Sequence, residues 1–83
     1  MFRIKLTAKA KRELKALSKS DKLRIGEIIE DLKEEPLVGK PLARELAKRY
    51  SYRVGVYRII YKVHSKDGII EVLSAGHRGI IYN

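Results

Sequence analysis

The stretch from residue 50 to residue 61 constrains the fold most, because it alternates side-chain types on either side of one glycine. Its sequence is Tyr-Ser-Tyr-Arg-Val-Gly-Val-Tyr-Arg-Ile-Ile-Tyr. Aromatic and β-branched residues favour strands, and strict alternation assigns successive side chains to opposite faces. Gly55 interrupts the pattern, so we predict two strands, at about 50–54 and 56–64, joined by a tight break. The side chains that then stand out from the sheet surface, flanked by tyrosines, are Arg53 and Arg58.

The N-terminal part of the chain predicts a strand followed by a helix. Residues 2–6 alternate apolar and basic side chains, which is typical of a strand with its apolar side chains turned inward. Thr7 offers an N-cap hydroxyl, and apolar residues then recur at helical spacing with lysines on the other face. We therefore expect a first helix over residues 8–17.

A second helix is predicted from about Asp21 to Glu35. Its isoleucines and leucines follow the i, i+3, i+4, i+7 rule that marks the buried face of a helix. Ser18 and Ser20 are equally good N-caps. Pro36 ends the helix, because the residue before a proline avoids the helical region. Too few residues join the two helices for anything but an antiparallel pair.

The rest of the chain predicts a loop and a last strand. Residues 36–49 begin as a loop because they contain two prolines and a glycine, and Leu42 and Leu46 are spaced for a short helical turn. Asp67–Gly68 supplies the turn chemistry of a hairpin. The strand at 69–75 is apolar almost throughout, so we expect it to lie centrally or to be covered on both faces, and to end at the glycine that follows.

This β-α-α-β-β-β order predicts an α+β fold in two layers. A helical hairpin packs on one face of a small, mostly antiparallel four-stranded sheet. A chain of 83 residues suffices for one domain with a modest core, so we expect a single domain over residues 1–83. The helices can cover only one face, so the other face or its rim carries the strand arginines and Arg78.

The chain is strongly basic, with a formal net charge of +9 at pH 7 and a pI near 10.0. Residues 36–83, the sheet half, hold nine Lys/Arg against three Asp/Glu, whereas residues 1–35 hold ten against seven. An excess of this size marks a candidate polyanion binder. The alternative explanation is a lysine-rich solvated surface of the kind that is common in thermophile proteins.

Composition also disfavours several classes of protein. The chain has no cysteine, so it forms neither a disulfide framework nor a thiolate metal site. No apolar run approaches the roughly 18–20 residues that a membrane span needs. A charged helix follows the first strand directly, so no signal peptide is visible. We therefore expect a soluble cytoplasmic protein that does not engage the membrane.

The charged and polar side chains of the sheet half are of the kinds that can bind and cleave a phosphodiester. His64 and His77 lie far apart in the sequence without a carboxylate cluster, so we predict neither a metal nor a cofactor. Guanidinium groups bind phosphate oxygens in a bidentate manner, tyrosines stack on unpaired bases, and His77 could exchange protons near neutral pH. RNA brings its own nucleophile, the 2′-hydroxyl, so the protein needs only to orient the strand and stabilise charge.

Each of these residues also has a purely structural explanation. Tyr57 and the other strand tyrosines are strand formers that can pack in the core. Arg53 and Arg58 can be solvated or belong to ion pairs. His77 can be an ordinary surface residue, and Tyr82 can be part of a frayed terminus. From the residues alone, the chain is a small basic α+β domain that could bind RNA.

Two stretches taken together resemble the RelE/ParE superfamily of toxins from toxin–antitoxin systems. The first is Arg53-Val54-Gly55-Val56-Tyr57-Arg58-Ile59-Ile60-Tyr61, which is similar to the family pattern R-V-G-D-Y-R-V-I-Y. The second is Gly76-His77-Arg78 with Tyr82, which is similar to G-H-R-x-x-x-Y. The length and the element order also resemble the family, so the resemblance covers the whole chain.

The resemblance implies an mRNA interferase of the RelE kind, a ribosome-dependent and metal-independent endoribonuclease. Such toxins cut mRNA in the A site by attack of the 2′-hydroxyl and leave a 2′,3′-cyclic phosphate. It implies that Arg58 neutralises the scissile phosphate, that Arg78 stabilises the transition state or protonates the leaving group, and that Tyr82 stacks on the nucleotide. The residues expected to bind the RNA are Lys48, Arg49, Arg53 and His77. The implied partners are a RelB-like antitoxin with an acidic or amphipathic helix, the ribosome and its A-site mRNA.

The chain departs from the family pattern at three positions, which bear on the strength of catalysis. Val56 replaces the usual aspartate of the turn, Ser51 replaces a frequently basic residue, and Gly79 stands where a charged residue is common. Two alternatives therefore stay open. The ParE branch shares the Tyr-Arg core but poisons DNA gyrase and is not a nuclease. A catalytically weak basic module would bind only an antitoxin or nucleic acid. The terminal Tyr82 favours the RelE kind.

Overall fold

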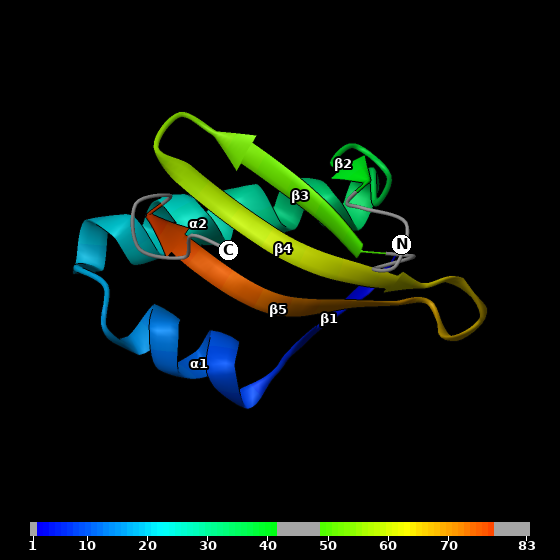
Figure 1. Ribbon diagram of the computed structural model, residues 1–83, viewed down its shortest axis with the longest axis horizontal. Helices are drawn as coiled ribbons and strands as arrows, with labels where there is room; N and C mark the ends of the chain where they lie inside the picture. Colours follow the sequence, from blue (N-terminus) through cyan, green and yellow to red (C-terminus); the bar gives the residue numbers. More distant parts are fainter. Residues whose placement is uncertain (1, 42–48, 78–83) are drawn as a thin grey trace.

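The computed structural model describes residues 2–41 and 49–77, and Figure 1 shows their path. The elements in chain order are β1 (Arg3–Leu6), α1 (Ala8–Lys15), α2 (Lys19–Glu34), β2 (Lys40–Pro41), β3 (Arg49–Val54), β4 (Tyr57–His64), a 3-10 turn (Ser65–Asp67) and β5 (Ile69–His77). This order is the predicted one with a single addition, the short strand β2.

The five strands form one sheet in the order β1-β5-β4-β3-β2. β1 pairs with β5 in parallel, and every other neighbouring pair is antiparallel. β5 therefore lies inside the sheet between β1 and β4, as its nearly continuous apolar sequence predicted. The prediction of a mostly antiparallel sheet is confirmed.

The prediction of four strands was wrong, because β2 adds Lys40 and Pro41 to the edge of β3. The prolines and glycine indicated a loop, and proline is tolerated at a sheet edge. The approach to β2 depends on Tyr61, whose side chain is fully buried. Its hydroxyl donates to the Pro36 carbonyl (2.8 Å) and accepts from the Gly39 N–H (3.0 Å). A long-range contact thus places a strand that no local pattern announces.

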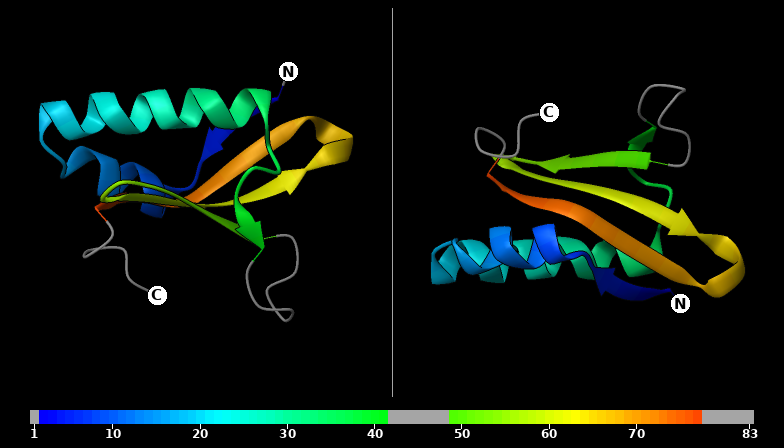
Figure 2. Two further views of the ribbon diagram at one scale, coloured as in Figure 1. Left: turned by 90° about the horizontal axis from the view of Figure 1, so that it is seen from above. Right: turned by 60° about the horizontal axis from the view of Figure 1, so that its bottom comes forward.

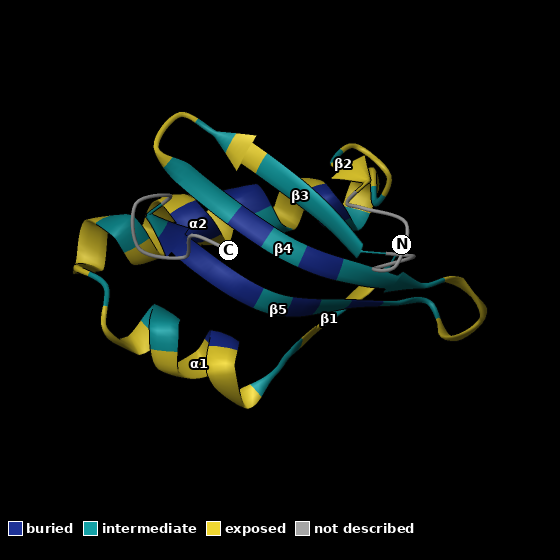
Figure 3. Cartoon of the chain, in the orientation of Figure 1, coloured by how far each residue is buried: buried dark blue, intermediate teal, exposed yellow. Residues whose placement is uncertain are grey.

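Both helices lie on one side of the sheet and run in opposite directions (Figures 1 and 2). The predicted two-layer α+β fold with a helical hairpin is confirmed. The core lies between the helices and the centre of the sheet, and Figure 3 shows buried positions along α2, β4 and β5. The buried apolar residues are Ala10, Ile25, Ile28, Leu32, Ile59, Tyr61, Ile70, Val72 and Ala75. We call the sheet face turned away from the helices the open face.

The helix ends differ from the predicted ones by a few residues. α1 stops at Lys15 instead of residue 17, and α2 spans Lys19–Glu34 instead of 21–35. Thr7 caps α1 as predicted, and its hydroxyl accepts from the Ala10 N–H at 3.1 Å. Of the two candidate caps of α2, the structure uses Ser18, whose hydroxyl accepts from the N–H of Asp21 at 3.2 Å.

The two predicted turns are confirmed at their glycines. Gly55 has a φ of 60° and Gly68 a φ of 66°, a conformation that glycine adopts without steric cost. β5 continues past its predicted end to His77. The predicted helical turn at Leu42 and Leu46 lies outside the described residues.

An irregularity divides β5 near its middle. Ile60 faces Ser74, whereas the next residue, Tyr61, faces Val72, so Leu73 is an extra residue in β5. A bulge of this kind bends its strand and increases the local twist. The two ends of the open face are therefore separated by a bend in the sheet.

Helix α1 braces β5 beyond the point where β1 ends. Glu13 Oε1 accepts hydrogen bonds from the Ala75 N–H (3.1 Å) and the Ser74 hydroxyl (2.8 Å), and Lys9 Nζ lies 2.8 Å from Oε2. Burial alone would raise the pKa of Glu13, but these hydrogen bonds outweigh it and lower the pKa. The ionised carboxylate thus fixes the end of β5 that leads to Gly76 and His77.

Candidate nucleic-acid interface

Strand register places four cations together on the open face. Ile59 and Tyr61 are buried under the helices, so the residues that alternate with them on β4, Arg58 and Lys62, lie on the other face. Arg53 of β3 is the direct cross-strand partner of Arg58, and Arg49 is the partner of Lys62. The structure therefore brings three of the predicted site residues onto one surface, namely Arg49, Arg53 and Arg58.

These cross-strand pairs carry like charges, which destabilises a sheet. Within residues 2–41 and 49–77, the ion pairs are Lys9–Glu13, Arg24–Glu27, Lys33–Glu30 and His64–Glu71. None of them includes one of the four cations. The Arg53–Arg58 pair is therefore left without an ion-pair partner in the described part of the chain, whereas Lys62 of the second pair has Glu71 as its cross-strand partner on β5. An anionic ligand would relieve this repulsion.

Arg58 has the most distinctive surroundings of the four. Its side chain is partly buried, and its Nε is fully buried without a hydrogen-bond partner among the described residues. Its neighbour on β5 is Gly76, which has no side chain to occupy the space beside the guanidinium. A buried donor without an acceptor is costly. Because Nε itself is closed to solvent, a phosphate would bind the terminal nitrogens of the guanidinium group.

His77 does not join the arginines. It pairs with Tyr57, and the two rings meet edge to face with their centroids 5.7 Å apart. The Tyr57 hydroxyl in turn donates to Asp21 Oδ1 at the start of α2 (2.5 Å), which places this group on the helix side of the sheet. That hydrogen bond lowers the pKa of Asp21 and raises the pKa of Tyr57. The family resemblance grouped His77 with the arginines as an RNA-binding residue, and no local pattern in the sequence assigns a face to the last residue of β5.

The other predicted site residues, Lys48, Arg78 and Tyr82, lie outside the described residues.

Two groups on the open face were not predicted from the sequence, namely Lys62 and the pair formed by His64 and Glu71. Lys62 alternates with Tyr61 along β4, so the strand pattern did hold a signal for it. His64 Nε2 lies 2.9 Å from Glu71 Oε1. The hydrogen bond from His64 is the main cause that lowers the pKa of Glu71, and the charges of Lys62 and Lys5 act in the same direction, whereas burial opposes them. This pairing depends on the β4–β5 register, which no local pattern gives.

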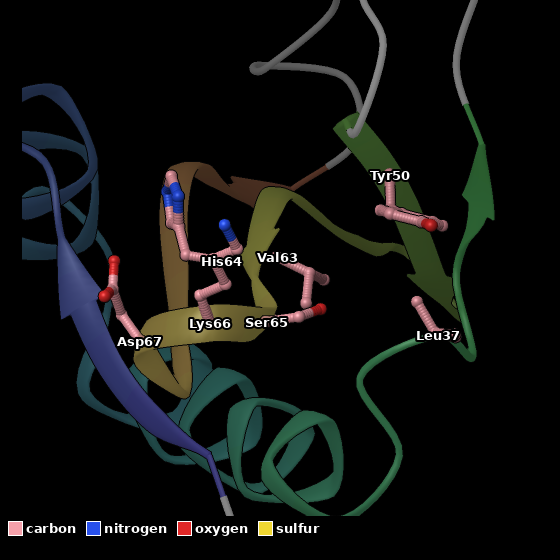
Figure 4. Close-up of a pocket in the computed structure, with 7 residues that line it drawn as sticks. All are labelled: Leu37, Tyr50, Val63, His64, Ser65, Lys66 and Asp67. Carbon is pink, nitrogen blue, oxygen red and sulfur yellow. The ribbon is translucent and has the colours of Figure 1, made fainter.

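Two depressions lie away from the arginines. One, of about 440 Å³, opens between α1 and the start of α2 and has an apolar base with basic side chains around it; its lining residues are Leu6, Lys11, Arg12, Leu14, Lys15 and Lys22. The other, also of about 440 Å³, lies beside the β4–β5 turn (Figure 4), with Leu37 and Tyr50 on one side and Val63 and Ser65 on the other. Among the described residues, no three His, Asp or Glu side chains are placed to hold a metal ion.

The family model for the ParE toxin of the type II toxin–antitoxin system parDE matches residues 4–82 of the chain. The chain belongs to the RelE/ParE toxin family. Toxin RelG from Mycobacterium tuberculosis is 37% identical over 83 residues, which cover 98% of this chain and 95% of that protein. The protein is therefore a toxin of a type II toxin–antitoxin system, as the two sequence motifs predicted.

Solved structures of the family share the fold. The toxin–antitoxin complex RelBE2 from Mycobacterium tuberculosis matches with a TM-score of 0.85 and 37% identity, covering 93% of this chain and 98% of that one. The archaeal RelE–RelB complex from Pyrococcus horikoshii matches with a TM-score of 0.72 and 27% identity, covering 95% and 97%. The intact RelBE complex from Escherichia coli, at 18% identity over 93% and 96% of the two chains, shows the same fold with a TM-score of 0.80. In the described part of the chain, no helix combines the length and apolarity that crossing a membrane requires.

Proposed function

We propose that this toxin is an mRNA interferase that cuts mRNA in the ribosomal A site. The RNA 2′-oxygen forms a bond to the adjacent phosphorus as its proton is removed, the bond from phosphorus to the 5′-oxygen breaks, and that oxygen takes up a proton. The products are a 2′,3′-cyclic phosphate and a free 5′-hydroxyl. The observation that carries the proposal is the group of four cations on the open face, in which Arg58 has a buried, unpartnered Nε among the described residues.

The roles follow from the chemistry of the side chains. Arg58 holds the scissile phosphate and stabilises the charge that builds on it during attack, because guanidinium stays protonated and binds two oxygens at once. Arg53 and Arg49 contact the neighbouring backbone. Arg78 and Tyr82 carry the roles of transition-state stabilisation and base stacking that the family motif implies.

The two remaining proposed RNA contacts differ in their support. Lys48 precedes Arg49 at the start of β3 and extends the same basic stretch. His77 packs on Tyr57 and not beside Arg58, so its proposed contact is with RNA that passes the end of β5. A proton-transfer role for His77 at the scissile phosphate is not part of the proposal.

The proposed protein partner is a RelB-like antitoxin. The depression between α1 and α2 fits an acidic amphipathic segment, because its apolar base is surrounded by Lys11, Arg12, Lys15 and Lys22. A Lys11→Glu/Lys15→Glu toxin should need more co-expressed antitoxin for growth rescue than the wild type. Rescue at an unchanged antitoxin level would contradict this seat.

Primer extension on a translated message after brief expression of the toxin tests the proposed activity. The expected result is discrete cuts within codons, absent with an Arg58→Ala/Arg78→Ala variant that folds normally by circular dichroism. Equal cutting by this variant would overturn the assignment. Growth arrest with intact messages and inhibited DNA supercoiling would instead indicate a toxin of the ParE kind. Neither arrest nor cuts would leave a basic module that binds a partner.

A further inference from the structure

All six Lys and Arg residues of strands β1, β3, β4 and β5 lie on the open face. Arg49, Arg53, Arg58 and Lys62 are placed there by the β3–β4 register. β1 adds two more, because Lys5 is the partner of Glu71 and Arg3 is the partner of Ile69, which alternates with the buried Ile70. Both β1 cations are exposed. The same four strands contain a single acid, Glu71.

The cations form two groups on the face. Arg53 and Arg58, the arginine pair, lie near the β3–β4 turn. The second group begins at Arg49, four residues before Arg53 along β3. It consists of cross-strand partners on four adjacent strands, and we call it the far row; its members are Arg49, Lys62, Glu71 and Lys5. At about 3.3 Å per residue and about 4.8 Å per strand, the far row lies about 13 Å from the arginine pair and spans about 14 Å. Only uncharged side chains of β3 and β4, those of Ser51 and Ile60, lie between the groups.

The far row keeps an excess of positive charge despite Glu71. Its three cations outnumber the one acid, and Glu71 already has a hydrogen-bonded partner in His64 at 2.9 Å. Neither Lys62 nor Lys5 lies within ion-pair distance of an acid in the part of the chain that the structure describes. The two lysines therefore flank Glu71 as cross-strand partners without forming an ion pair with it among the described residues. Lys62 lies about 13 Å along β4 from Arg58, and Lys5 lies two strands further across the sheet.

We propose that the far row is a second phosphate-binding site, in which Lys62 and Lys5 hold the RNA backbone away from the cut. This inference rests on the proposed function, which makes RNA the ligand of the arginine pair. A single strand of RNA carries a regular series of negative charges and can cross both groups, including the uncharged gap between them. Among the described residues, the apolar side chains on this face are few, namely Ile60, Ile69 and the bulge residue Leu73, so charge complementarity favours the nucleic acid.

The test uses 2′-O-methyl RNA, which binds as RNA does but cannot be cut by attack of a 2′-hydroxyl. Fluorescence anisotropy measures the affinity for a dinucleotide and for an oligonucleotide of about 12 nucleotides, because the single phosphate of the dinucleotide cannot occupy both groups at once. The variant is Lys5→Gln/Lys62→Gln. The control, Lys19→Gln/Arg24→Gln, loses the same charge from exposed positions on α2.

We expect the far-row variant to lose affinity for the longer RNA only. Each phosphate contact contributes about 0.7 to the slope of log K against log salt, so two lost contacts lower the slope by about 1.4 and the affinity about 25-fold at about 0.1 M salt. Glu71→Gln should have the opposite effect and tighten binding, which partial unfolding cannot mimic.

Three results would overturn the far row as a site. They are an equal loss with the α2 control, an equal loss with both RNA lengths, and no binding of the longer RNA by the wild type. If the variant loses affinity for an acidic protein and not for RNA, the face is a protein interface. The primer-extension assay decides the proposed nuclease activity separately. Cutting without far-row binding would overturn only this inference, and far-row binding without cutting would overturn only the nuclease.

Discussion

The residue with the clearest conflict between stability and function is Arg53, which stands directly opposite Arg58. Like charges at such positions repel, and threonine is a good strand former. Arg53→Thr should therefore stabilise the fold by a few tenths of a kcal/mol to about 1 kcal/mol, or a few degrees in Tm for a domain of this size. Thermal denaturation at low salt checks this. We expect the gain to shrink at high salt, and a lower Tm for the variant would contradict the proposed repulsion.

Arg58 should tolerate no replacement in the proposed reaction, even one that keeps its charge. Lysine cannot hold two phosphate oxygens in a planar fork, so Arg58→Lys should be impaired and Arg58→Gln more so. Loss of a preorganised group that stabilises the transition state costs about 10²–10³-fold in rate. Single-turnover cleavage of ribosome-bound mRNA measures both variants, with circular dichroism as the folding control. Full activity of Arg58→Gln would remove Arg58 from the chemistry.

At the scale of elements, β2 depends on the contact between Tyr61 and Gly39. Tyr61→Phe leaves two partly buried backbone groups without a partner and should cost about 1–3 kcal/mol. A Cβ on Gly39 would lie 2.7 Å from the Tyr61 hydroxyl, so Gly39→Ala should also destabilise. Because the two changes act on one contact, the double variant should lose less than the single losses predict. Chemical denaturation of all four proteins measures this coupling, and strict additivity would contradict it.

The brace between α1 and β5 should make stability depend on pH. The folded pKa of Glu13 is below its ordinary value of 4.5, so the carboxylate stabilises the fold above that value and loses this effect as pH falls through the lowered pKa. Glu13→Gln should be less stable at pH 7 by about 1–3 kcal/mol and should lose less of its Tm than the wild type between pH 6 and pH 3. Asp21 and Glu71 shift in the same direction, so the variant keeps part of the acid sensitivity. Parallel Tm curves for the two proteins would contradict the role of Glu13.

The elements that depend on local patterns could be predicted from the sequence, and the ones that depend on partners could not. Alternation gave Arg53 and Arg58 a common face, and Thr7 and the glycine turns followed from capping and backbone preferences. β2 could not be predicted because its pairing depends on the Tyr61 hydroxyl, which is distant in the sequence. The far row and the sheet face of His77 could not be predicted because they depend on the strand register across β5. A bulge at Leu73 shifts the alternation of β5 side chains between the two faces by one residue.

The whole molecule places its two proposed ligands on opposite sides. The open face carries the strand cations, and the depression between α1 and α2 carries a separate basic group on the helix side. A net charge of +9 on 83 residues therefore reflects two surfaces and not one uniform coat. With this arrangement, an acidic antitoxin would bind at the helices, and its negative charge would also weaken the electrostatic attraction between the open face and RNA.

Such a charge should also make the free toxin more stable when salt or a polyanion is added. Self-repulsion destabilises a compact state of high net charge, and salt screens it. Of the four ion pairs in the described part of the chain, three are helix pairs at i, i+3 or i+4 spacing that contribute little, so screening them costs less than screening the repulsion gains. The Tm should rise between about 0.05 and 0.5 M NaCl, across which the screening length falls from above 10 Å to below 8 Å.

At the lower salt, 2′-O-methyl RNA should raise the Tm by binding the native open face, and the higher salt should abolish this rise. A Tm that falls with salt would mean that attractive pairs dominate, and an RNA effect that survives high salt would show that contacts other than phosphate charges hold the strand.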